Sequence, residues 1–201
     1  MLKLIPVAAL AVVAGVAAGC GRSDEGESGD SRAPKAREKK GPKTPEAVSY
    51  DKVVKEVGDW TGEGAAVVTN AALDTKTTEA AALRTWKPII DHVGDWSAQG
   101  AALLTATAIH TKTDPAIVNR KFDEVVDVVG DWSGEGAALV TAAAIDTGTP
   151  TKVAIKRFSD NVDTVGDWSA EAAASLTARQ MYREADKQPS ADQSMIFYDA
   201  D

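Results

Sequence analysis

The tetrapeptide Val-Gly-Asp-Trp occurs four times in this 201-residue chain, and it constrains the possible folds more than any other feature. Its tryptophans are Trp60, Trp96, Trp132 and Trp168, so successive copies begin 96 − 60 = 36 residues apart each time. Self-similarity at a fixed period of roughly 20–50 residues is typical of repeat architectures. We therefore expect four copies of one structural unit.

The similarity between the copies extends well beyond the tetrapeptide. A second aromatic residue stands ten positions before each tryptophan, at Tyr50, Trp86, Phe122 and Phe158. Each tryptophan is followed by Thr or Ser, then by Glu or Gln, and then by two alanines. One threonine closes the shared pattern, at Thr69, Thr105, Thr141 and Thr177, and we expect its hydroxyl to bond back to the preceding helical turn.

The third copy shows the helical signals most clearly. Asp114 followed by Pro115 predicts a helix start, and apolar residues then recur in steps of four, three and four at Val118, Phe122, Val125 and Val129. The alanine-rich segment 136–145 predicts a second helical stretch, which Asp146 to Pro150 should end. No useful length of chain alternates with period two, so the sequence predicts an all-α fold.

The segment between these two stretches allows two architectures. In the first, Gly130 is a left-handed residue that closes one helix and Asp131 caps the next, so four helix pairs stack into a short α-solenoid. In the second, each copy is one long helix and four such helices form an antiparallel bundle. Interior glycines would cost about 1 kcal/mol each in a long helix. Pro88 would cost about 3 kcal/mol, so the helix pair is favoured.

The copied tryptophans and aspartates are the candidate ligand-binding residues. One interpretation buries each tryptophan in a seam between helices, since aromatic side chains dominate small cores. The other exposes them as a row that stacks on sugar rings or on a proline-rich peptide. The aspartates are predicted helix caps, with contact to a ligand as the alternative. These candidates are Trp60, Trp96, Trp132, Trp168, Asp59, Asp95, Asp131 and Asp167.

The first twenty residues carry a targeting signal. Lys3 precedes an apolar run from Leu4 to Ala18, which has the length of a secretory signal core. The run ends in Ala17-Ala18-Gly19-Cys20, which resembles the lipobox of bacterial lipoproteins. The resemblance implies cleavage before Cys20 and lipid attachment to that cysteine. Gly21, in place of an Asp at this position, implies the outer membrane where a cell has two membranes.

Four regions follow from these patterns: a signal peptide at 1–19, a lipidated and disordered charged tether at 20–43, a helical domain at 44–187 and a flexible tail at 188–201. The tether lacks aromatic and β-branched residues, so it cannot bury enough apolar surface to fold. From Pro45 onwards the chain has 25 acidic and 14 basic residues, a net charge of 14 − 25 = −11.

A non-catalytic role is the expected function. No nucleophile, metalloprotease or phosphate-loop motif is present. We therefore expect neither a cofactor nor a metal, and the overall charge of −8 argues against nucleic acid. The sequence predicts a lipid-anchored envelope protein whose domain binds another envelope protein or has a structural role, through acidic positions such as Asp123, Glu124 and Asp127. The alternative is a glycan- or peptide-binding module that uses the tryptophans.

Overall fold

The computed structural model of the protein describes residues 49–130, 132–166 and 169–187. The chain divides into two units, 1–46 and 47–201, and all of the described residues belong to the second. The predicted signal peptide, Cys20, the tether and the tail therefore lie outside the described residues. The described part consists of helices and short connections without a strand, which confirms the all-α prediction.

Two helices fall in each 36-residue period. The odd-numbered helices are α1 (Asp51–Gly58), α3 (Glu79–Val93), α5 (Pro115–Val129) and α7 (Thr151–Val165). The even-numbered helices are α2 (Gly62–Asp74), α4 (Ala98–Thr111), α6 (Gly134–Asp146) and α8 (Ala170–Ala185). The helix-pair architecture therefore agrees with the described helices, and the bundle of four long helices is wrong. None of the described helices is both long enough and apolar enough to cross a membrane.

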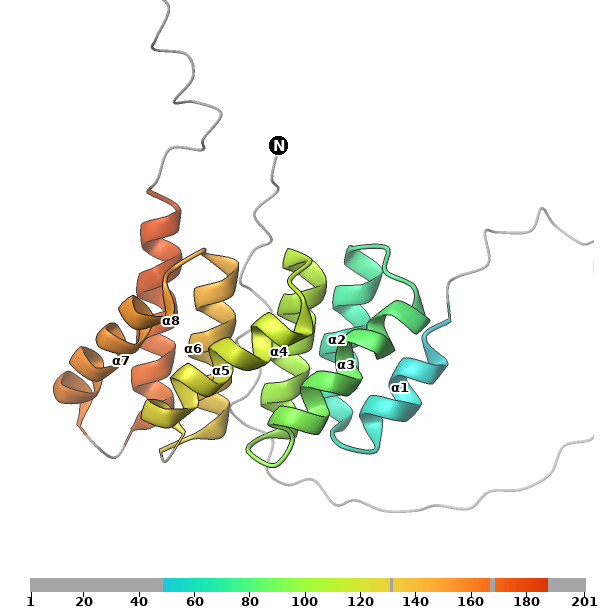
Figure 1. Ribbon diagram of the computed structural model, residues 1–201, viewed down its shortest axis with the longest axis horizontal. Helices are drawn as coiled ribbons and strands as arrows, with labels where there is room; N and C mark the ends of the chain where they lie inside the picture. The colour runs from blue at the N-terminus through green and yellow to red at the C-terminus, as the bar shows by residue number, and fades with distance from the viewer. Residues whose placement is uncertain (1–48, 131, 167–168, 188–201) are drawn as a thin grey trace, which may run out of the picture. The chain divides into compact units, whose positions relative to one another are not determined.

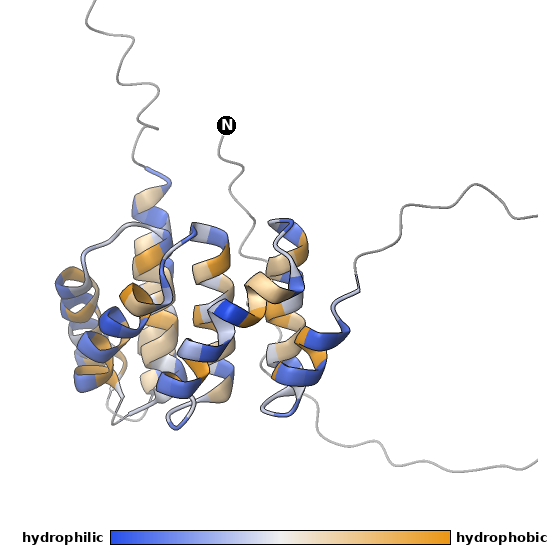
Figure 2. Ribbon diagram, turned by 45° about the vertical axis from the view of Figure 1, so that its right-hand side comes forward, coloured by the Kyte–Doolittle hydropathy of each residue, from blue (hydrophilic) through white to orange (hydrophobic). Residues whose placement is uncertain are grey.

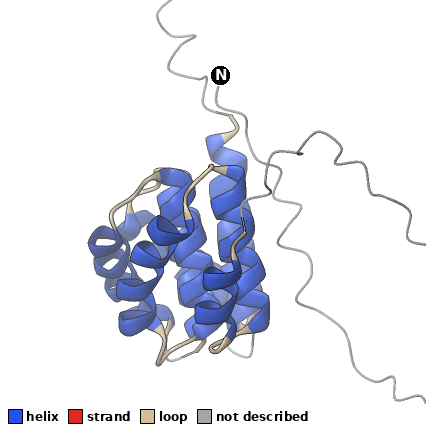
Figure 3. Ribbon diagram, turned by 90° about the vertical axis from the view of Figure 1, so that its right-hand side faces the viewer, coloured by secondary structure: helices blue, strands red, loops and turns tan. Residues whose placement is uncertain are grey.

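The odd-numbered and even-numbered helices form two separate layers, which Figure 1 shows from the front and Figure 3 shows edge-on. Each helix contacts the next member of its own layer, and each odd-numbered helix also packs against the even-numbered helix that follows it. All of the connections within pairs consequently lie at one end of the layers. The tetrapeptides therefore meet at a single edge of the helical unit.

The odd-numbered helices supply the large side chains of the core. Trp86, Phe122 and Phe158 are fully buried, and Tyr50 is 7% exposed and donates a hydrogen bond of 2.7 Å to the carbonyl of Thr77. In α1, α3 and α5, valines or isoleucines one turn further on complete the buried stripe, while the outer faces of these helices are largely polar (Figure 2). In α7 the equivalent position is the buried Asn161, whose side chain donates to the hydroxyl of Thr177 at 2.8 Å. The spacing of apolar residues thus marks the buried face of α1, α3 and α5.

Small residues set the spacing of the even-numbered helices. A Cβ atom placed on Gly100 would lie 2.9 Å from the Cβ of Ala138 on the next helix, closer than real Cβ atoms approach one another. The same holds for Gly64, whose Cβ would lie 2.8 Å from that of Ala102. The position equivalent to Gly100 in the fourth copy is Ala172, which is exposed, and within the described residues no helix follows α8. Glycine thus occurs where the following helix packs too closely for a Cβ atom.

The two ends of the even-numbered layer differ in polarity. On α8 the outward residues include Ser175 and Arg179, where α6 has the apolar Leu139 and the buried Ala143. On α2, by contrast, Leu73 is 47% exposed, whereas the equivalent residues Ile109 and Met181 are buried. A polar face on α8 is the usual way in which a stack of helices ends.

The tetrapeptide glycines do not adopt the left-handed conformation that the sequence predicted. Gly94 has φ −56° and Gly130 has φ −64°, and Gly58 is the last residue of α1. Gly166 has φ +89°, but its ψ of 155° also lies outside the left-handed helical region. The left-handed residues stand at the opposite turns, after α2, α4 and α6, at Lys76, Lys112 and Gly148.

A hydroxyl-bearing residue makes the break between paired helices. In the second copy the carbonyl of Val93 accepts from the amides of Trp96 and Ser97, at 2.9 and 3.2 Å, so the chain turns once more after α3. Ser97 is then extended, with φ −168°, and α4 begins. Pro88 lies inside α3, so the expected cost of proline did not exclude it from a helix. The amide side chain of Asn119 on α5 donates to the carbonyl of Pro88 at 3.0 Å.

Candidate functional site

The tetrapeptide tryptophans face solvent, which contradicts the prediction that they fill seams of the core. Trp60 is 53% exposed, Trp96 is 49% exposed and Trp132 is 47% exposed. Trp168 lies outside the described residues. Each of the three described rings lies in the turn between two paired helices, outside the buried stripes of both helices. The prediction holds for the other aromatic series, because Tyr50, Trp86, Phe122 and Phe158 are all buried.

The prediction that the aspartates cap the second helix of each pair is wrong for Asp59 and Asp95. The side chains that accept hydrogen bonds from the first helical turn belong to Thr61, Ser97 and Ser133, two positions later, at 3.4, 2.9 and 2.9 Å. Asp59 instead continues the turn after α1, with φ −64°, and its side chain is exposed. Asp95 is exposed as well, and Asp131 and Asp167 lie outside the described residues. The hydroxyls have the extended backbone that an N-cap requires.

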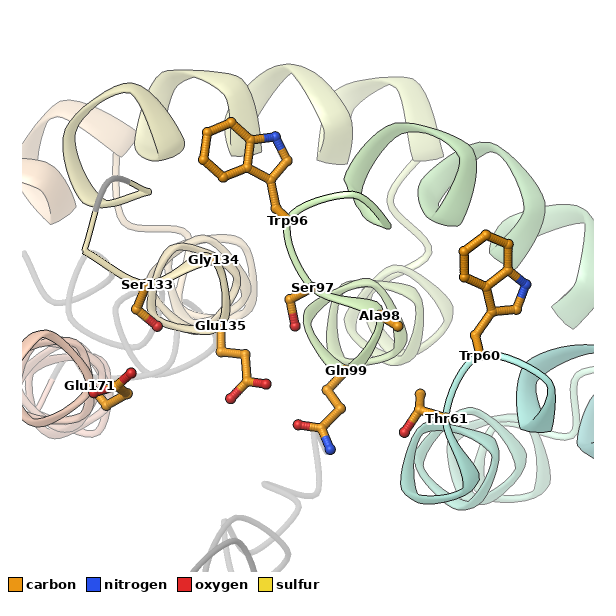
Figure 4. A pocket seen from close by; sticks show the side chains of 10 residues that line it. All are labelled: Trp60, Thr61, Trp96, Ser97, Ala98, Gln99, Ser133, Gly134, Glu135 and Glu171. Atoms are coloured by element: carbon orange, nitrogen blue, oxygen red, sulfur yellow. The ribbon is translucent and has the colours of Figure 1, made fainter.

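An open groove of about 590 Å³ runs along this edge of the helical unit (Figure 4). Its lining comes from the turn before α2 and from the first turns of α4, α6 and α8, with the residues that precede them. Figure 4 shows the Trp60 and Trp96 rings on one side of the loops and the Gln99, Glu135 and Glu171 side chains on the other. Trp132 is not among the residues that line it. The lining residues are Trp60, Thr61, Trp96, Ser97, Ala98, Gln99, Ser133, Gly134, Glu135 and Glu171.

The Trp96 ring lies against the following copy. A Cβ atom on Gly130 would come within 3.1 Å of the Trp96 ring, and one on Gly134 would come within 2.6 Å of the Trp96 carbonyl oxygen. The chain thus passes close to Trp96 at two glycines. This packing covers part of the ring, and about half of the Trp96 surface stays exposed.

The groove is acidic. Glu135 and Glu171 are exposed and line it, whereas none of the described residues that line it is Lys, Arg or His. Gln99 donates to a carboxylate oxygen of the neighbouring Glu63 at 3.1 Å, which links the first turns of α4 and α2. Carboxylates at these positions also interact favourably with the positive ends of their own helices.

We define the tryptophan edge as Trp60, Trp96 and Trp132 together with the first turns of α2, α4, α6 and α8. Chemically it offers flat apolar faces on one side and carboxylate, amide and hydroxyl groups on the other. Such an arrangement can hold a ligand by stacking and hydrogen bonding. Among the described residues there is no cluster of three metal-binding side chains. His92 and His110 stand apart from the groove lining.

The other predicted residues have local structural contacts. Thr105, Thr141 and Thr177 each donate to the carbonyl four residues earlier at 2.8 Å, as predicted. Thr69 does not, because its hydroxyl has no hydrogen-bond partner within the described part of the chain. On the predicted acidic face, the carboxylate of Asp123 lies 2.7 Å from Nε2 of His92, while Glu124 and Asp127 are exposed.

Sequence reasoning overlooked several groove residues because it gave them another role. Glu135 and Glu171 lie in the first turns of α6 and α8, where a carboxylate is favourable, and they also line the groove. The available signal was their spacing, since Glu63, Gln99, Glu135 and Glu171 recur every 36 residues beside the copied tryptophans. A residue at the start of one helix in each copy must lie at the same edge as the turn before it.

Comparison of the chain with models of protein families, with curated proteins and with solved structures finds no match. The functional conclusion therefore depends on the geometry of the groove.

Proposed function

We propose that this chain is a lipid-anchored, non-catalytic binding protein of the bacterial envelope, and that the tryptophan edge holds an extended segment of a partner protein. The observation that carries the proposal is the contrast between the two aromatic series. Trp86 is fully buried, whereas Trp60, Trp96 and Trp132 are each about half exposed at equivalent positions. Tryptophan is enriched in protein interfaces and at the residues that dominate their binding energy.

The dimensions of the site support a binding role. Ligand sites typically have volumes of about 300–1,000 Å³, and the groove of about 590 Å³ lies within this range. It crosses the ends of several neighbouring helices rather than penetrating between them, so it suits a linear ligand that lies across the array. Stacked helical repeats commonly present such extended binding surfaces.

The envelope location rests on the N-terminal sequence. The lipobox-like Ala17-Ala18-Gly19-Cys20 supports acylation of Cys20, and the charged segment that follows supports a tether between membrane and domain. A membrane-anchored binding domain would meet partners in the same envelope. The chain as a whole would then retain or position a partner close to the membrane.

The experiment is a partner capture with the full-length chain from envelope extract, comparing the natural protein with Trp60→Ala and Trp96→Ala. The proposal expects bound partners to be lost in both variants while the melting temperature changes little. Val153→Ala is the matched control, since Val153 is 40% exposed and outside the groove. Undiminished capture by both tryptophan variants would contradict the proposal. Capture lost equally by Val153→Ala would also count against it.

A glycan ligand is the competing possibility for the same edge, because tryptophan faces also stack on sugar rings. Displacement of captured partners by an oligosaccharide, but not by a peptide, would favour it. In that case the edge would still be the binding site and the partner class would change.

A further inference from the structure

We infer that the tryptophan edge, if it is the binding site proposed above, recognises an extended peptide segment that carries Lys or Arg at about every third residue. The charge of the groove is the first argument. Its lining contains Glu135 and Glu171 without a basic side chain, and Gln99 connects it to the exposed Glu63. A neutral ligand that covered these carboxylates would remove water from them without supplying an opposite charge, which costs free energy.

An anionic ligand does not suit this edge, although four helix N-termini meet there. One amide in the first turn of each of α2, α4 and α6, that of Gly64, Gly100 or Gly136, already donates to the hydroxyl of Thr61, Ser97 or Ser133. Glu63 and Glu135 in the first turns of α2 and α6, and Glu171 in that of α8, place carboxylates at the same helix ends. A further negative charge would meet like charges at short range, whereas a cation would be attracted.

The tryptophans provide a second attraction for cations. A Lys ammonium or Arg guanidinium placed over the face of an indole gains about 0.5–2 kcal/mol from the ring quadrupole. The Trp60 and Trp96 rings lie on one side of the loops, and the side chains of Glu135 and Glu171 lie on the other (Figure 4). A segment with several basic side chains would therefore place some of them over the rings and others beside the carboxylates.

The spacing of the helices selects an extended backbone. Packed helices lie about 8–10 Å apart, and a polyproline II segment advances about 3.1 Å per residue with three residues per turn, or about 9.3 Å per turn. Every third side chain would thus return to the same place on the next helix. The backbone of such a segment makes no internal hydrogen bonds, so its polar groups are available to Ser97, Gln99 and Ser133.

The test uses four synthetic probes and the full-length chain, with binding followed by tryptophan fluorescence and by calorimetry. The first probe is a blocked peptide of four Pro-Pro-Lys units. The second replaces each Lys with Gln, and the third has the composition of the first with its four lysines adjacent. The fourth is a neutral N-acetylglucosamine tetramer. We expect the first peptide to bind at least tenfold more tightly than the other three, and to weaken as salt screens the charges.

Charge variants of the protein sharpen the result. Glu135→Gln should weaken binding of the Pro-Pro-Lys peptide several-fold, and Gln99→Glu should strengthen it, although it brings a second carboxylate beside Glu63. Glu124→Gln is the matched control, because it removes the same charge from an exposed position outside the groove. It should leave the affinity unchanged. Opposite effects of the first two variants are not expected from a change in folding alone.

Several outcomes would overturn the inference. Equal binding of the Lys and Gln peptides would exclude recognition of charge, and equal binding of the two lysine arrangements would exclude the three-residue spacing. Binding of the sugar alone, when lost in Trp96→Ala, would refute a peptide ligand but leave the tryptophan edge as the binding site. Binding of no probe would also overturn it. The proposed function is tested separately, because its outcome depends on partner capture by the tryptophan variants and the Val153→Ala control and not on binding of these probes.

Discussion

Ser97 holds the first turn of α4 through a hydrogen bond of 2.9 Å from the Gly100 amide, and its backbone is extended. Asp95, two residues earlier, belongs to the turn that closes the preceding helix, and its side chain is exposed. A short polar side chain favours the start of a helix only if it precedes the first helical residue directly. The tryptophan between these two residues therefore lies outside both helices, and this explains its exposure.

The first prediction compares these two residues. Ser97→Ala should lower the free energy of unfolding by about 0.5–2 kcal/mol, because the Gly100 amide loses its acceptor. Asp95→Ala should change it by less than about 0.5 kcal/mol, as expected for an exposed surface position. Urea denaturation followed by circular dichroism measures both. If Asp95→Ala lowered the free energy of unfolding more than Ser97→Ala did, the aspartate and not the serine would be the helix cap.

The second prediction concerns the space around two glycines. Gly100→Ala would bring a Cβ within 2.9 Å of that of Ala138. Such overpacking costs about 1–3 kcal/mol, which exceeds the gain of about 1 kcal/mol in helix propensity. Gly62→Ala meets nothing within 4 Å and should be stabilising. Thermal unfolding of the two variants should therefore shift in opposite directions, and a stabilised Gly100→Ala would show that the helices are not closely packed there.

At the scale of helices, the even-numbered layer depends on small residues over most of its length. Gly64, Gly100 and Gly136 approach Ala102, Ala138 and Ala174 on the following helices. Near its C-terminal end the layer also contains a large polar side chain, that of Tyr182. Tyr182 on α8 is paired with Asp146, the last residue of α6, and burial, the nearby negative charge and a hydrogen bond to Asp146 together raise the pKa of its phenol well above the usual value.

This shift predicts a loss of stability at alkaline pH. Because the pKa of Tyr182 is higher in the folded protein than the unfolded value of about 10, the folded state retains a proton that the unfolded chain releases. The contribution is fully present below about pH 10 and is lost progressively as the pH rises above it. Tyr182→Phe should show a smaller decrease in melting temperature between pH 9 and 11 than the natural protein. Parallel pH profiles for the two proteins would contradict this prediction.

At the scale of the whole helical unit, the two ends of the even-numbered layer are not equivalent. The outer face of α2 exposes Leu73, at 47%, whereas α8 presents Ser175 and Arg179. If α8 carried the residues of α6 at these positions, one unit could dock on the α2 face of another in a head-to-tail manner. Heterologous contacts of this kind do not close on themselves and lead to open assemblies.

The fourth prediction follows from this asymmetry. The double variant Ser175→Leu with Arg179→Ala should self-associate in a concentration-dependent way, because it restores the apolar side chains found on α6. Sedimentation analysis measures the association. Ser159→Leu with Arg120→Ala, a matched change at two exposed positions on α7 and α5, should not associate. A double variant that sediments like the natural protein would show that the polar face of α8 does not limit assembly.

The sequence predicted the helices better than the turns. The spacing of Val118, Phe122, Val125 and Val129 marks a buried stripe, and all four are buried. The same heptad spacing continues through Trp132, which misleadingly assigns that ring to the core, because periodicity alone does not show that Ser133 interrupts the helix. Likewise, Gly130 suggests a left-handed turn, yet its own φ is −64°. The residues with positive φ are instead Lys112 and Gly148, at the other end of the layers. Side-chain periodicity determines faces, whereas turn geometry depends on local hydrogen bonds.

The groove could not be predicted from the sequence, because its residues are far apart along the chain. Its residues are close in space only because α2, α4, α6 and α8 begin at the same edge, and that follows from the helix-pair architecture. With the long-helix alternative open, the same tryptophans would have met in the centre of a bundle. The 36-residue spacing of Glu135 and Glu171 was visible, but it became a site only after the architecture was determined.

The central claim is that the tetrapeptide tryptophans face solvent while Trp86 fills the core. It is tested most directly by two single-tryptophan proteins, one retaining Trp96 and the other retaining Trp86, with the remaining tryptophans replaced by Phe. The structure predicts red-shifted emission that acrylamide quenches readily for Trp96, and blue-shifted, protected emission for Trp86. Emission from Trp96 that is as blue and as protected as that of Trp86 would contradict the account.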